Sequence, residues 1–513
     1  MKKHLAWLVS LTVLQFPVFS QSYEWRKVLG GYGASVVADG IGNVYATGSF
    51  EGTADFGLGN GTLNLTSAGD DDVFVIKMNA TGQIVWAKRI GDTTDDSSVA
   101  IALDGSGNIY VSGNVESYAS DVFITKLDSD GNFLWTKTVG GQYNDYVYSM
   151  AVDAGGNVYT TGHFESGGDF DPGAEASFLY CSGGYCMYVL KLDTDGNFVW
   201  ATQNEGSAYA EGHSIRIDTK GEVCITGSFT DWSDFAPGAE TYELTSAGET
   251  DIFLLKLYPS GAFVSATRYG SPGTDNGAAI AIGAGGELYL AGSFRGIADF
   301  DPGAGTYPLL TNGLSDAFVA KFDAAGNIAW ARNVGGSDND LGSDVGVDQS
   351  GGVYVAGRFQ AVADFDPGAG EHKMLASAYT ADNFLLKLDA SGNFVWSDQT
   401  DKSSFHIMVD PSGTVYGVGS IFVVKLDGLI MGVETSPGEA GVKIYPNPAT
   451  GVLNIESSQP AATYRIVDQL GREVMRGSVD GLQTTIDLAG LESGLYLLSL
   501  DRPRTKPVKV IKY

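Results

Sequence analysis

Residues 39–50 read DGIGNVYATGSF, and variants of this stretch return six times before residue 428. The closing glycine of the stretch falls at positions 48, 113, 162, 227, 292, 357 and 419. A repeat of this length indicates an array of supersecondary units, each of which buries its apolar faces against its neighbours. The array therefore predicts the architecture before any functional residue is considered.

A second half-motif completes each copy: Phe-x-x-Lys, a turn, and then Trp. Residues 128–135, DSDGNFLW, show the turn and the tryptophan. Apolar and polar residues alternate through each segment, which is typical of strands. The Asp-x-x-Gly-Asn stretches between segments predict hairpin turns, because aspartate caps a turn and glycine accepts positive φ. Four strands per copy predict one blade of a β-propeller.

The seventh copy lacks its last strand, since no tryptophan segment follows Lys425. The missing segment is found at the N-terminus, where residues 23–31 read YEWRKVLGG, comparable with FLWTKTVGG at 133–141. We therefore predict an all-β chain with a seven-bladed propeller at 21–428, closed by its N-terminal strand. The copies resemble the bacterial seven-bladed β-propeller repeat family over residues 23–428. The resemblance implies the fold and an extracellular setting, but no single activity.

Composition and the first residues bear on location and partners. The 513 residues carry a formal net charge of −30, which argues against nucleic acid or an anionic membrane surface as a partner. Residues 1–20 predict a secretory signal peptide, with Lys2 and Lys3 ahead of an apolar stretch and a cleavage site after Ser20. A transmembrane anchor is the alternative for this segment, although Gln15 and Pro17 interrupt it, and no later segment is apolar enough to be transmembrane.

The three cysteines predict one disulfide. Cys181 and Cys186 flank Ser-Gly-Gly-Tyr, which indicates a small disulfide-closed loop in an oxidising compartment. Cys224 stands where other copies carry tyrosine, and we interpret it as a buried packing thiol.

An insertion between the second and third strands carries the motif Asp-Phe-Asp-Pro-Gly-Ala at 169–174, 299–304 and 364–369. Pro-Gly suits the centre of a turn, aspartate caps it, and phenylalanine anchors it, so the motif is interpreted first as structural. In the alternative, carboxylates two residues apart bind Ca²⁺, the one candidate cofactor. The candidate metal ligands are Asp169, Asp171, Asp299, Asp301, Asp364 and Asp366.

Blade topology places these insertions on the same face as the connections between blades. The connections are also acidic, at Asp92, Asp95, Asp96, Asp145, Glu211, Asp275, Asp338 and Asp340. We therefore expect one strongly negative face that carries the long loops and is free to vary for binding.

No catalytic residues are predicted. His163, His213, His372 and His406 are scattered, and no nucleophile elbow, zinc motif or phosphate loop is found in the sequence. We predict a non-catalytic protein that binds a glycan, a protein or a surface component through the acidic face. The alternatives are a polysaccharide hydrolase or lyase on the same scaffold, and a structural component of the envelope.

The C-terminal part differs in pattern. Residues 429–440 predict a linker, and residues 441–513 predict a small β-sandwich. The latter resembles the type A sorting domain of the type IX secretion system, through Tyr445-Pro446-Asn447-Pro448, Gly471-Arg472, and Gly494 with Tyr496. The resemblance implies the type IX machinery as a partner. It also implies a protein released from, or displayed on, the outer membrane of a Gram-negative bacterium.

Overall fold

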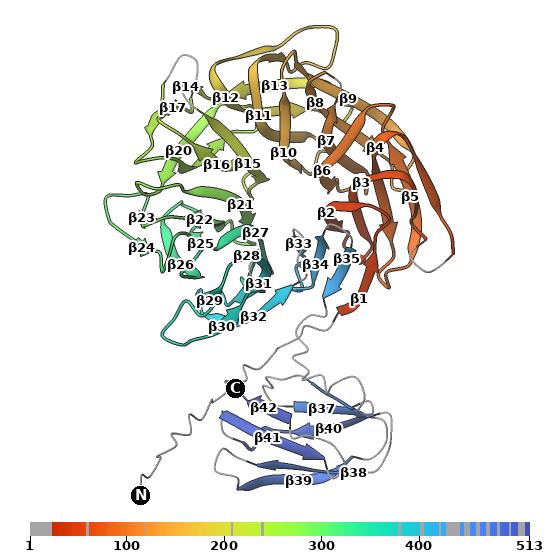
Figure 1. Ribbon diagram of the computed structural model, residues 1–513, viewed down its shortest axis with the longest axis vertical. Coiled ribbons are helices and arrows are strands. Elements are labelled where there is room, and N and C mark those ends of the chain that lie inside the picture. The colour runs from red at the N-terminus through yellow and green to blue at the C-terminus, as the bar shows by residue number, and fades with distance from the viewer. Residues whose placement is uncertain are drawn as a thin grey trace, which may run out of the picture. The chain divides into compact units, whose positions relative to one another are not determined.

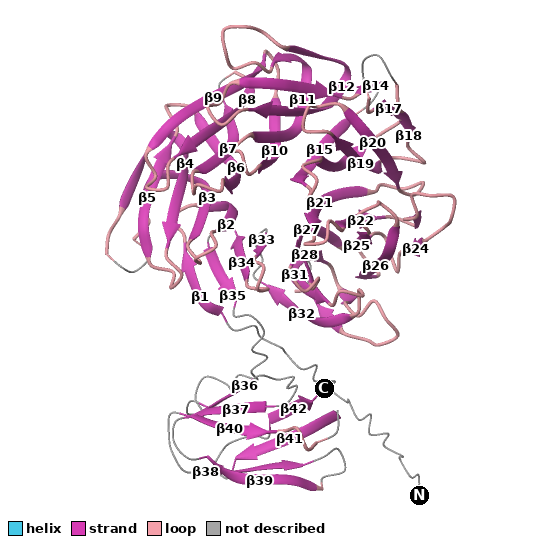
Figure 2. Cartoon of the chain, turned by 180° about the vertical axis from the view of Figure 1, so that it is seen from behind, coloured by secondary structure: helices cyan, strands magenta, loops and turns pink. Residues whose placement is uncertain are grey.

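The computed structural model describes residues 23–57, 61–116, 118–206, 209–236, 241–377, 381–400, 405–419, 422–426, 442–445, 452–457, 462–467, 472–479, 483–491, 494–500 and 508–512. The regular elements in these ranges are all β-strands (Figure 1, Figure 2). Among these residues, none forms a helix long and apolar enough to cross a membrane. The predicted signal peptide and linker lie outside the described residues. Tyr23–Gly428 forms one compact unit, and residues 429–513 belong to a second.

The first unit is a β-propeller, as the sequence predicts. Its described strands form seven four-stranded antiparallel blades, and residues of the inner strands line a central channel. Figure 1 shows the blades arranged in a ring. Named from the inner to the outer strand, the first blade is β2 (Tyr32–Ala38), β3 (Val44–Asp55), β4 (Asn64–Met78), β5 (Ile84–Ile90), and the second is β6 (Asp95–Leu103), β7 (Ile109–Glu116), β8 (Ser120–Leu127), β9 (Phe133–Gly141). The third blade is β10 (Asp145–Val152), β11 (Val158–Asp169), β12 (Phe178–Leu192), β13 (Phe198–Gln203), the fourth is β15 (Ala210–Ile217), β16 (Val223–Phe229), β19 (Asp251–Leu257), β20 (Phe263–Tyr269), and the fifth is β21 (Asn276–Ile282), β22 (Leu288–Phe294), β25 (Asp316–Phe322), β26 (Ile328–Gly336). The sixth blade is β27 (Leu341–Val347), β28 (Val353–Phe359), β31 (Asp382–Leu388), β32 (Phe394–Thr400), and the seventh is β33 (Phe405–Val409), β34 (Val415–Gly419), β35 (Phe422–Leu426), β1 (Tyr23–Val28).

The N-terminal strand β1 supplies the outer strand of the seventh blade. It pairs antiparallel with β35, with Trp25 opposite Lys425. This is the register of the first blade, where Trp86 lies opposite Lys77. Because the last blade takes its outer strand from the start of the chain, the ring is closed by ordinary sheet hydrogen bonds.

Tryptophans on four of the outer strands join one blade to the next through indole hydrogen bonds. The Trp25 indole Nε1 donates to the Ala80 carbonyl at 3.2 Å, in the last turn of the first blade. Gly82 of that turn has φ +73° and packs on the Trp25 ring, where a Cβ would lie 2.7 Å from Cδ2. Corresponding indole hydrogen bonds are made by Trp135, Trp200 and Trp330. The tryptophan therefore has a packing role, and here it joins the two ends of the ring.

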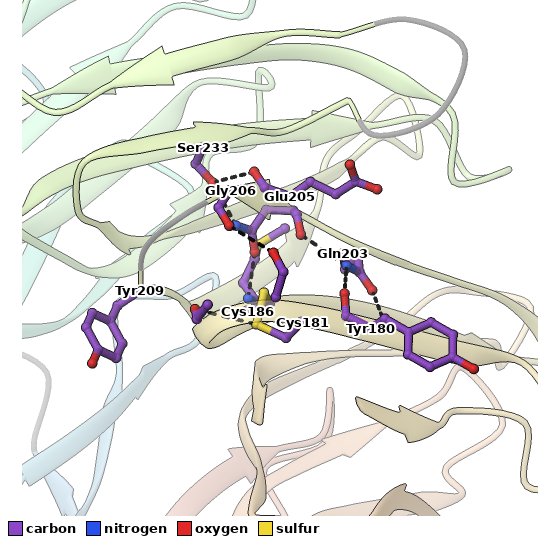
Figure 3. The surroundings of a disulfide bond; sticks show 12 residues. Tyr180, Cys181, Cys186, Gln203, Glu205, Gly206, Tyr209 and Ser233 are labelled. Carbon is purple, nitrogen blue, oxygen red and sulfur yellow. Dashed lines mark hydrogen bonds between the residues drawn. A yellow bond between two sulfur atoms is a disulfide. The ribbon is translucent and has the colours of Figure 1, made fainter. Parts of the chain in front are cut away.

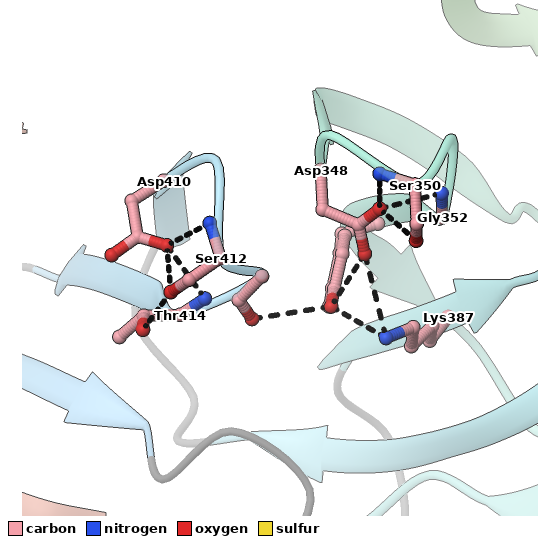
Figure 4. A network of polar contacts seen from close by, with 9 residues as sticks. Asp348, Ser350, Gly352, Lys387, Asp410, Ser412 and Thr414 are labelled. Atoms are coloured by element: carbon pink, nitrogen blue, oxygen red, sulfur yellow. Dashed lines mark hydrogen bonds and ion pairs between the residues drawn. The ribbon is translucent and has the colours of Figure 1, made fainter.

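One face, which we call the turn face, carries the Asp-x-x-Gly turns. Asp348 shows the pattern in Figure 4: its Oδ1 accepts the backbone N–H groups of Ser350 and Gly352 at 2.9 and 2.8 Å, and Lys387 Nζ lies 3.7 Å from Oδ2. Burial raises the pKa of Asp348, but the hydrogen bonds and Lys387 outweigh it and hold the pKa below its ordinary value. The Asp410 turn of the next blade repeats the cap with Ser412 and Thr414.

The opposite face, the loop face, carries the insertions and the connections between blades. Gly168, at the end of an insertion strand, pairs with Gly141 in the preceding connection, which places both on this face. In the first and third blades, the insertions lengthen the blade strands themselves, since β4 and β12 each have 15 residues. Elsewhere they form separate small strands: β17 (Trp232–Asp234), β18 (Glu243–Thr245), β23 (Ile297–Asp299), β24 (Pro308–Leu310), β29 (Val362–Asp364) and β30 (Lys373–Leu375). The connection between the third and fourth blades contributes β14 (Glu205–Gly206), which pairs with β17.

The second unit is the predicted β-sandwich. One sheet holds β36 (Val442–Tyr445), β37 (Val452–Ser457) and β40 (Gln483–Asp487), and the other holds β38 (Ala462–Val467), β39 (Glu473–Val479), β41 (Gly494–Leu500) and β42 (Val508–Lys512). A core that includes Leu453, Ile486, Ile466 and Leu498 draws on strands of both sheets.

Candidate functional site at the loop face

The Asp-Phe-Asp-Pro-Gly-Ala motifs cap turns. In the third blade, Oδ1 of Asp169 accepts the N–H groups of Asp171 and Ser177 at 3.0 and 2.8 Å. Oδ1 of Asp171 accepts the N–H of Gly173 at 2.7 Å, and Phe170 is fully buried. The same contacts recur at Asp299 and Asp301, and at Asp364 and Asp366. These carboxylates thus have a structural role that follows from the motif itself.

Within the described ranges, no three or more His, Cys, Asp or Glu side chains gather in a way that could hold a metal ion. In each motif, one oxygen of each of the two aspartates already accepts backbone N–H groups. The Ca²⁺ hypothesis for the six aspartates therefore stays a prediction, with two carboxylates per motif as its donors.

The expectation of a strongly negative loop face is wrong for four of the acidic residues on which it rests. Asp96, Asp145, Asp275 and Asp340 are all buried, at no more than 5% exposure. They turn inward because their carboxylates cap the connections between blades. For instance, Oδ2 of Asp145 accepts the Gly141 N–H at 2.7 Å. Their charge is therefore internal to the fold and is not presented to a ligand.

A second feature of the loop face is a β-bulge in six of the inner strands. The bulge leaves one extra residue between paired positions, and that residue lines the central channel. In four blades the bulge residue is modest in size: Ala34, Val99, Ala278 and Ser343. In the third and fourth blades it is Tyr148 and His213. Two neighbouring blades thus put polar aromatic side chains where the others leave space.

Glu211 joins the histidines of these two blades. Its carboxylate lies 3.1 Å from His213 Nε2 and 3.5 Å from His163 Nδ1. The hydrogen bond from His213, followed by the charges of the two imidazoles, outweighs burial and holds the pKa of Glu211 below its ordinary value. Burial lowers the pKa of His163 despite the nearby Glu211, so His163 is neutral at pH 7. Glu211 is thus hydrogen-bonded to His213 and lies beside His163, whose buried Nδ1 has no hydrogen-bond partner.

Tyrosines surround these three side chains. The Tyr148 ring centroid lies 5.4 Å from that of His163 and 5.8 Å from that of His213. Tyr146 lies 5.2 Å and Tyr185 4.6 Å from His163, between ring centroids. We call the set of Tyr146, Tyr148, His163, Tyr185, Glu211 and His213 the mouth cluster. Burial raises the pKa of Tyr148 and of Tyr146, so both phenols stay protonated at neutral pH.

A disulfide holds one edge of the mouth cluster. Cys181 and Cys186 are bonded, and the loop that they close carries Tyr185. Figure 3 shows the surroundings: Gln203 clamps Tyr180 through two hydrogen bonds, at 2.9 and 2.7 Å. Tyr185 packs at 5.2 Å on Tyr209, which is 53% exposed. Cys224, by contrast, is fully buried, and burial raises the pKa of its thiol to about 12. It is a packing residue, as its position in the repeat predicts.

The mouth cluster opens into the central channel, which has a volume of about 720 Å³. Tyr148 and His213 line it, together with Arg216, Asp344 and His406. Asp344 accepts the Ile407 N–H at 3.0 Å and lies 3.6 Å from His406 Nδ1. Among the described lining residues, Arg216 is the one arginine or lysine and Asp344 the one aspartate or glutamate. In a chain of net charge −30, the channel lining is therefore close to neutral.

The sequence identifies His163, His213 and Glu211 as candidates but does not predict that they lie side by side. The sequence does contain one indication of the site. In two copies of the repeat, the residue after the first valine or glycine of the inner strand is aromatic and polar: Tyr148 in one and His213 in the other. What could not be predicted is the bulge, which turns that residue into the channel.

The comparisons with known proteins begin with family models. Residues 443–512 match the model of the secretion system C-terminal sorting domain, and residues 85–114 match that of the β-propeller repeat. The chain ends in a type IX secretion sorting domain. The protein is therefore exported by this system and is secreted or displayed at the cell surface, and the sorting domain interacts with the secretion machinery.

Two curated relatives match part of the chain. One is an uncharacterized WD repeat-containing protein of Acanthamoeba polyphaga mimivirus, 26% identical over 182 residues. The other is the regulatory protein FlaEY of Caulobacter vibrioides, 27% identical over 166 residues. Each match covers 32% of this chain, but only 13% and 17% of the respective relatives.

Among solved structures, Sqt1 from Chaetomium thermophilum is 10% identical, with a TM-score of 0.40 over 80% of this chain and 99% of that one. PorZ, a surface component of the type IX secretion system of Porphyromonas gingivalis, is 14% identical, with a TM-score of 0.23 over 93% and 74%. A polysaccharide lyase acting on ulvan is 12% identical, with a TM-score of 0.39 over 80% and 96%. At these scores, none of the three supports a functional argument.

The sorting motif is partly described. Tyr445 ends β36, Arg472 precedes β39 and is exposed, and Gly494 begins β41. Tyr496 is buried in the sandwich core. Pro446, Asn447, Pro448 and Gly471 lie outside the described residues.

Proposed function

We propose that the protein is an exported binding protein for a saccharide chain, and that the mouth cluster is its combining site. The observation that carries the proposal is the cluster itself: tyrosines and histidines gather around Glu211 at the mouth of the channel, in two blades of a repeat that is otherwise uniform. Export by type IX secretion brings the site to the extracellular side, where saccharide polymers are available.

The chemistry of the cluster supports this choice of ligand. Tyrosine rings offer flat apolar surfaces for the C–H faces of a sugar, and their hydroxyls supply hydrogen bonds at the edge. His213 and Glu211 add a polar pair that can meet sugar hydroxyls. A channel of about 720 Å³ lies within the range typical of small-ligand sites.

Exposed aromatic side chains extend the surface beyond the cluster. Tyr143 and Tyr209 are 51% and 53% exposed, and Phe178 and Tyr180 stack at 6.0 Å on the insertion of the third blade. Since single exposed aromatics are common, it is their concentration on the third and fourth blades that supports an extended site.

A glycan array probed with the full-length secreted protein would test the proposal. For any saccharide that binds, we expect Tyr148→Ala and His213→Ala each to weaken affinity at least about tenfold, because each removes a contact at the centre of the site. The matched controls are Val99→Ala and Ser343→Ala, at the same bulge position of other blades, and they should leave affinity unchanged. Equal effects of all four changes would contradict a site at the mouth cluster.

A second candidate is a polysaccharide lyase or hydrolase at the same place. The observation that favours it is the neutral His163 beside Glu211 and Tyr148, since an imidazole and a phenol can serve as general base and acid. Release of new chain ends from a bound polysaccharide, abolished by Tyr148→Phe with binding retained, would replace the binding-only proposal. No release from any saccharide that binds would support it.

A further inference from the structure

Pairs of aspartates 24 residues apart recur on the loop face. The first member lies in the third strand of a blade, and the second lies at the end of the following connection or the start of the next inner strand. The pairs are Asp72 with Asp96, Asp121 with Asp145, Asp251 with Asp275, and Asp316 with Asp340. In the third blade, Cys186 and Ala210 stand at these positions instead.

Three of the pairs, all but Asp251 with Asp275, converge on a glycine at the end of the outer strand. A Cβ added to Gly335 would lie 2.7 Å from Oδ1 of Asp316 and 2.9 Å from Oδ2 of Asp340. Gly140 stands in the same way between Oδ1 of Asp121 and Oδ2 of Asp145. Because both carboxylates face one point, two negative charges would repel each other strongly if both groups were ionised.

The oxygens that face each other differ in their partners. Oδ2 of Asp340 accepts the Gly336 N–H at 2.6 Å, and its Oδ1 accepts the Gln360 N–H at 3.0 Å. Oδ2 of Asp316 accepts from Asn312 and Asn333. Oδ1 of Asp316 is buried and has no hydrogen-bond partner, and the same holds for Oδ1 of the first aspartate in the other three pairs, Asp72, Asp121 and Asp251. Asp340 thus accepts through both oxygens and Asp145 through Oδ2, while the first aspartate of each pair presents a bare oxygen.

The four pairs fall into two classes, according to whether an arginine forms an ion pair with the first aspartate. Arg89 forms an ion pair with Asp72, and Arg268 with Asp251. The equivalent residues are Thr138 and Asn333 in the other two pairs, which therefore have no cation there. The charged groups that act on Asp145 are Asp121 and Glu165, and those that act on Asp340 are Asp316 and Asp338, all of them acidic.

We propose that the Asp121–Asp145 and Asp316–Asp340 pairs each bind one proton at about pH 6, with Oδ1 of the first aspartate donating to Oδ2 of the second. The proton replaces the arginine that serves the other two pairs, and it gives the bare Oδ1 a hydrogen bond. Each protonated pair joins a blade to the following connection. The connection at Asp145 leads directly into Tyr146 and Tyr148 of the mouth cluster, so loss of that proton changes the edge of the candidate site.

The electrostatics agree with this geometry. Burial, the largest cause, and the Asp121 charge raise the pKa of Asp145 to about 7 despite the Gly141 N–H, and burial raises that of Asp340 to about 6. Burial also raises the pKa of Asp96 to about 6, so it is the arginine contacts that distinguish the two classes of pair. A folded pKa above the unfolded value of about 4 means that the folded state holds the extra proton in between. The contribution of this bound proton to the stability of the folded state is complete below about pH 4, and it is lost as the pH rises through 6 to 7. The two groups of a pair titrate together.

Infrared difference spectroscopy of the full-length protein tests the proposal directly. We expect a carboxylic acid C=O band at pH 6 that disappears by about pH 8. Asp121→Asn and Asp316→Asn place an amide N–H where the proton would be, so each should remove part of the band, keep the melting temperature at pH 5, and flatten its decline toward pH 8. Tyrosine near-ultraviolet circular dichroism should also lose its pH dependence in Asp121→Asn.

Asp251→Asn is the matched control in an arginine-backed pair. It leaves Arg268 without its anion, so the melting temperature should fall by a few degrees while the infrared band is unchanged. Absence of the band in the unmodified protein at pH 6 would overturn the proposal even if a variant failed to fold. An unchanged band in both Asp121→Asn and Asp316→Asn would do the same, and would indicate that buried water meets the bare oxygens.

Discussion

Aspartates of the turn face and of the loop face serve the same repeat in opposite ways. Asp104 and Asp153 cap turns, and their hydrogen bonds outweigh the effect of burial and hold the pKa of each below its ordinary value. Asp145 and Asp340 cap connections, but burial beside another carboxylate raises their pKa. The comparison teaches that the repeat specifies where an aspartate stands, whereas burial and neighbouring charges decide what it does. The turn face is thereby uniform and structural, and the loop face is where blades differ.

The largest loss of stability is expected when the contacts of β1 that close the ring are removed. Trp25→Ala should destabilise the propeller by about 3–5 kcal/mol, because it removes a large buried ring and its bond to the first blade. Urea denaturation measures this. Trp232→Ala is the control, since Trp232 is 41% exposed on an insertion strand. Equal losses would mean that β1 does not close the ring.

Removing the disulfide tests whether the structure of the loop face at the third blade depends on this cross-link. Replacing Cys181 and Cys186 by serine should cost about 2 kcal/mol, as expected for closing a short loop. Because the loop carries Tyr185, saccharide binding should weaken as well. Melting temperatures measured with and without reductant show the contribution of the disulfide. The Cys224→Ser variant is the control for the loss of a thiol that forms no disulfide. Stable binding after removal of the disulfide would exclude Tyr185 from the site.

A single turn cap should have a smaller effect. Asp104→Ala removes the acceptor for the Ser106 and Asn108 N–H groups and should cost about 1 kcal/mol. The depressed pKa of Asp104 means that this stabilisation is present above about pH 4 and lost below it. Melting temperatures from pH 3 to 6 would show the variant approaching the unmodified protein at low pH. A gap that stays constant with pH would contradict the charged cap.

The smallest effect is expected from chelation. Because the insertion aspartates already cap turns, removing Ca²⁺ should shift the melting temperature by less than about 1 °C. A clear rise on adding Ca²⁺, lost in Asp171→Asn, would instead establish the metal site that the sequence suggests. Asp130→Asn, on the turn face, is the control for the loss of one surface charge.

Most of the fold could be predicted from the sequence, because strand alternation, turn residues and the tryptophan position are local patterns. The closing role of residues 23–31 followed from the same patterns, and Trp25 stands where they place it. The candidate site could not be predicted, since it depends on bulges that aim Tyr148 and His213 into the channel. Nor could the inward turn of Asp145 and Asp340, because burial depends on how the connection packs and not on its composition.

Hydrogen exchange with mass spectrometry, with and without a saccharide identified on the array, tests the central claim most directly. The claim is that ligands meet the loop face at the third and fourth blades. We predict protection of amides in residues 141–148, 180–187 and 209–213, with turns such as 104–108 and 153–157 unchanged. Protection confined to the turns of the opposite face would contradict the account.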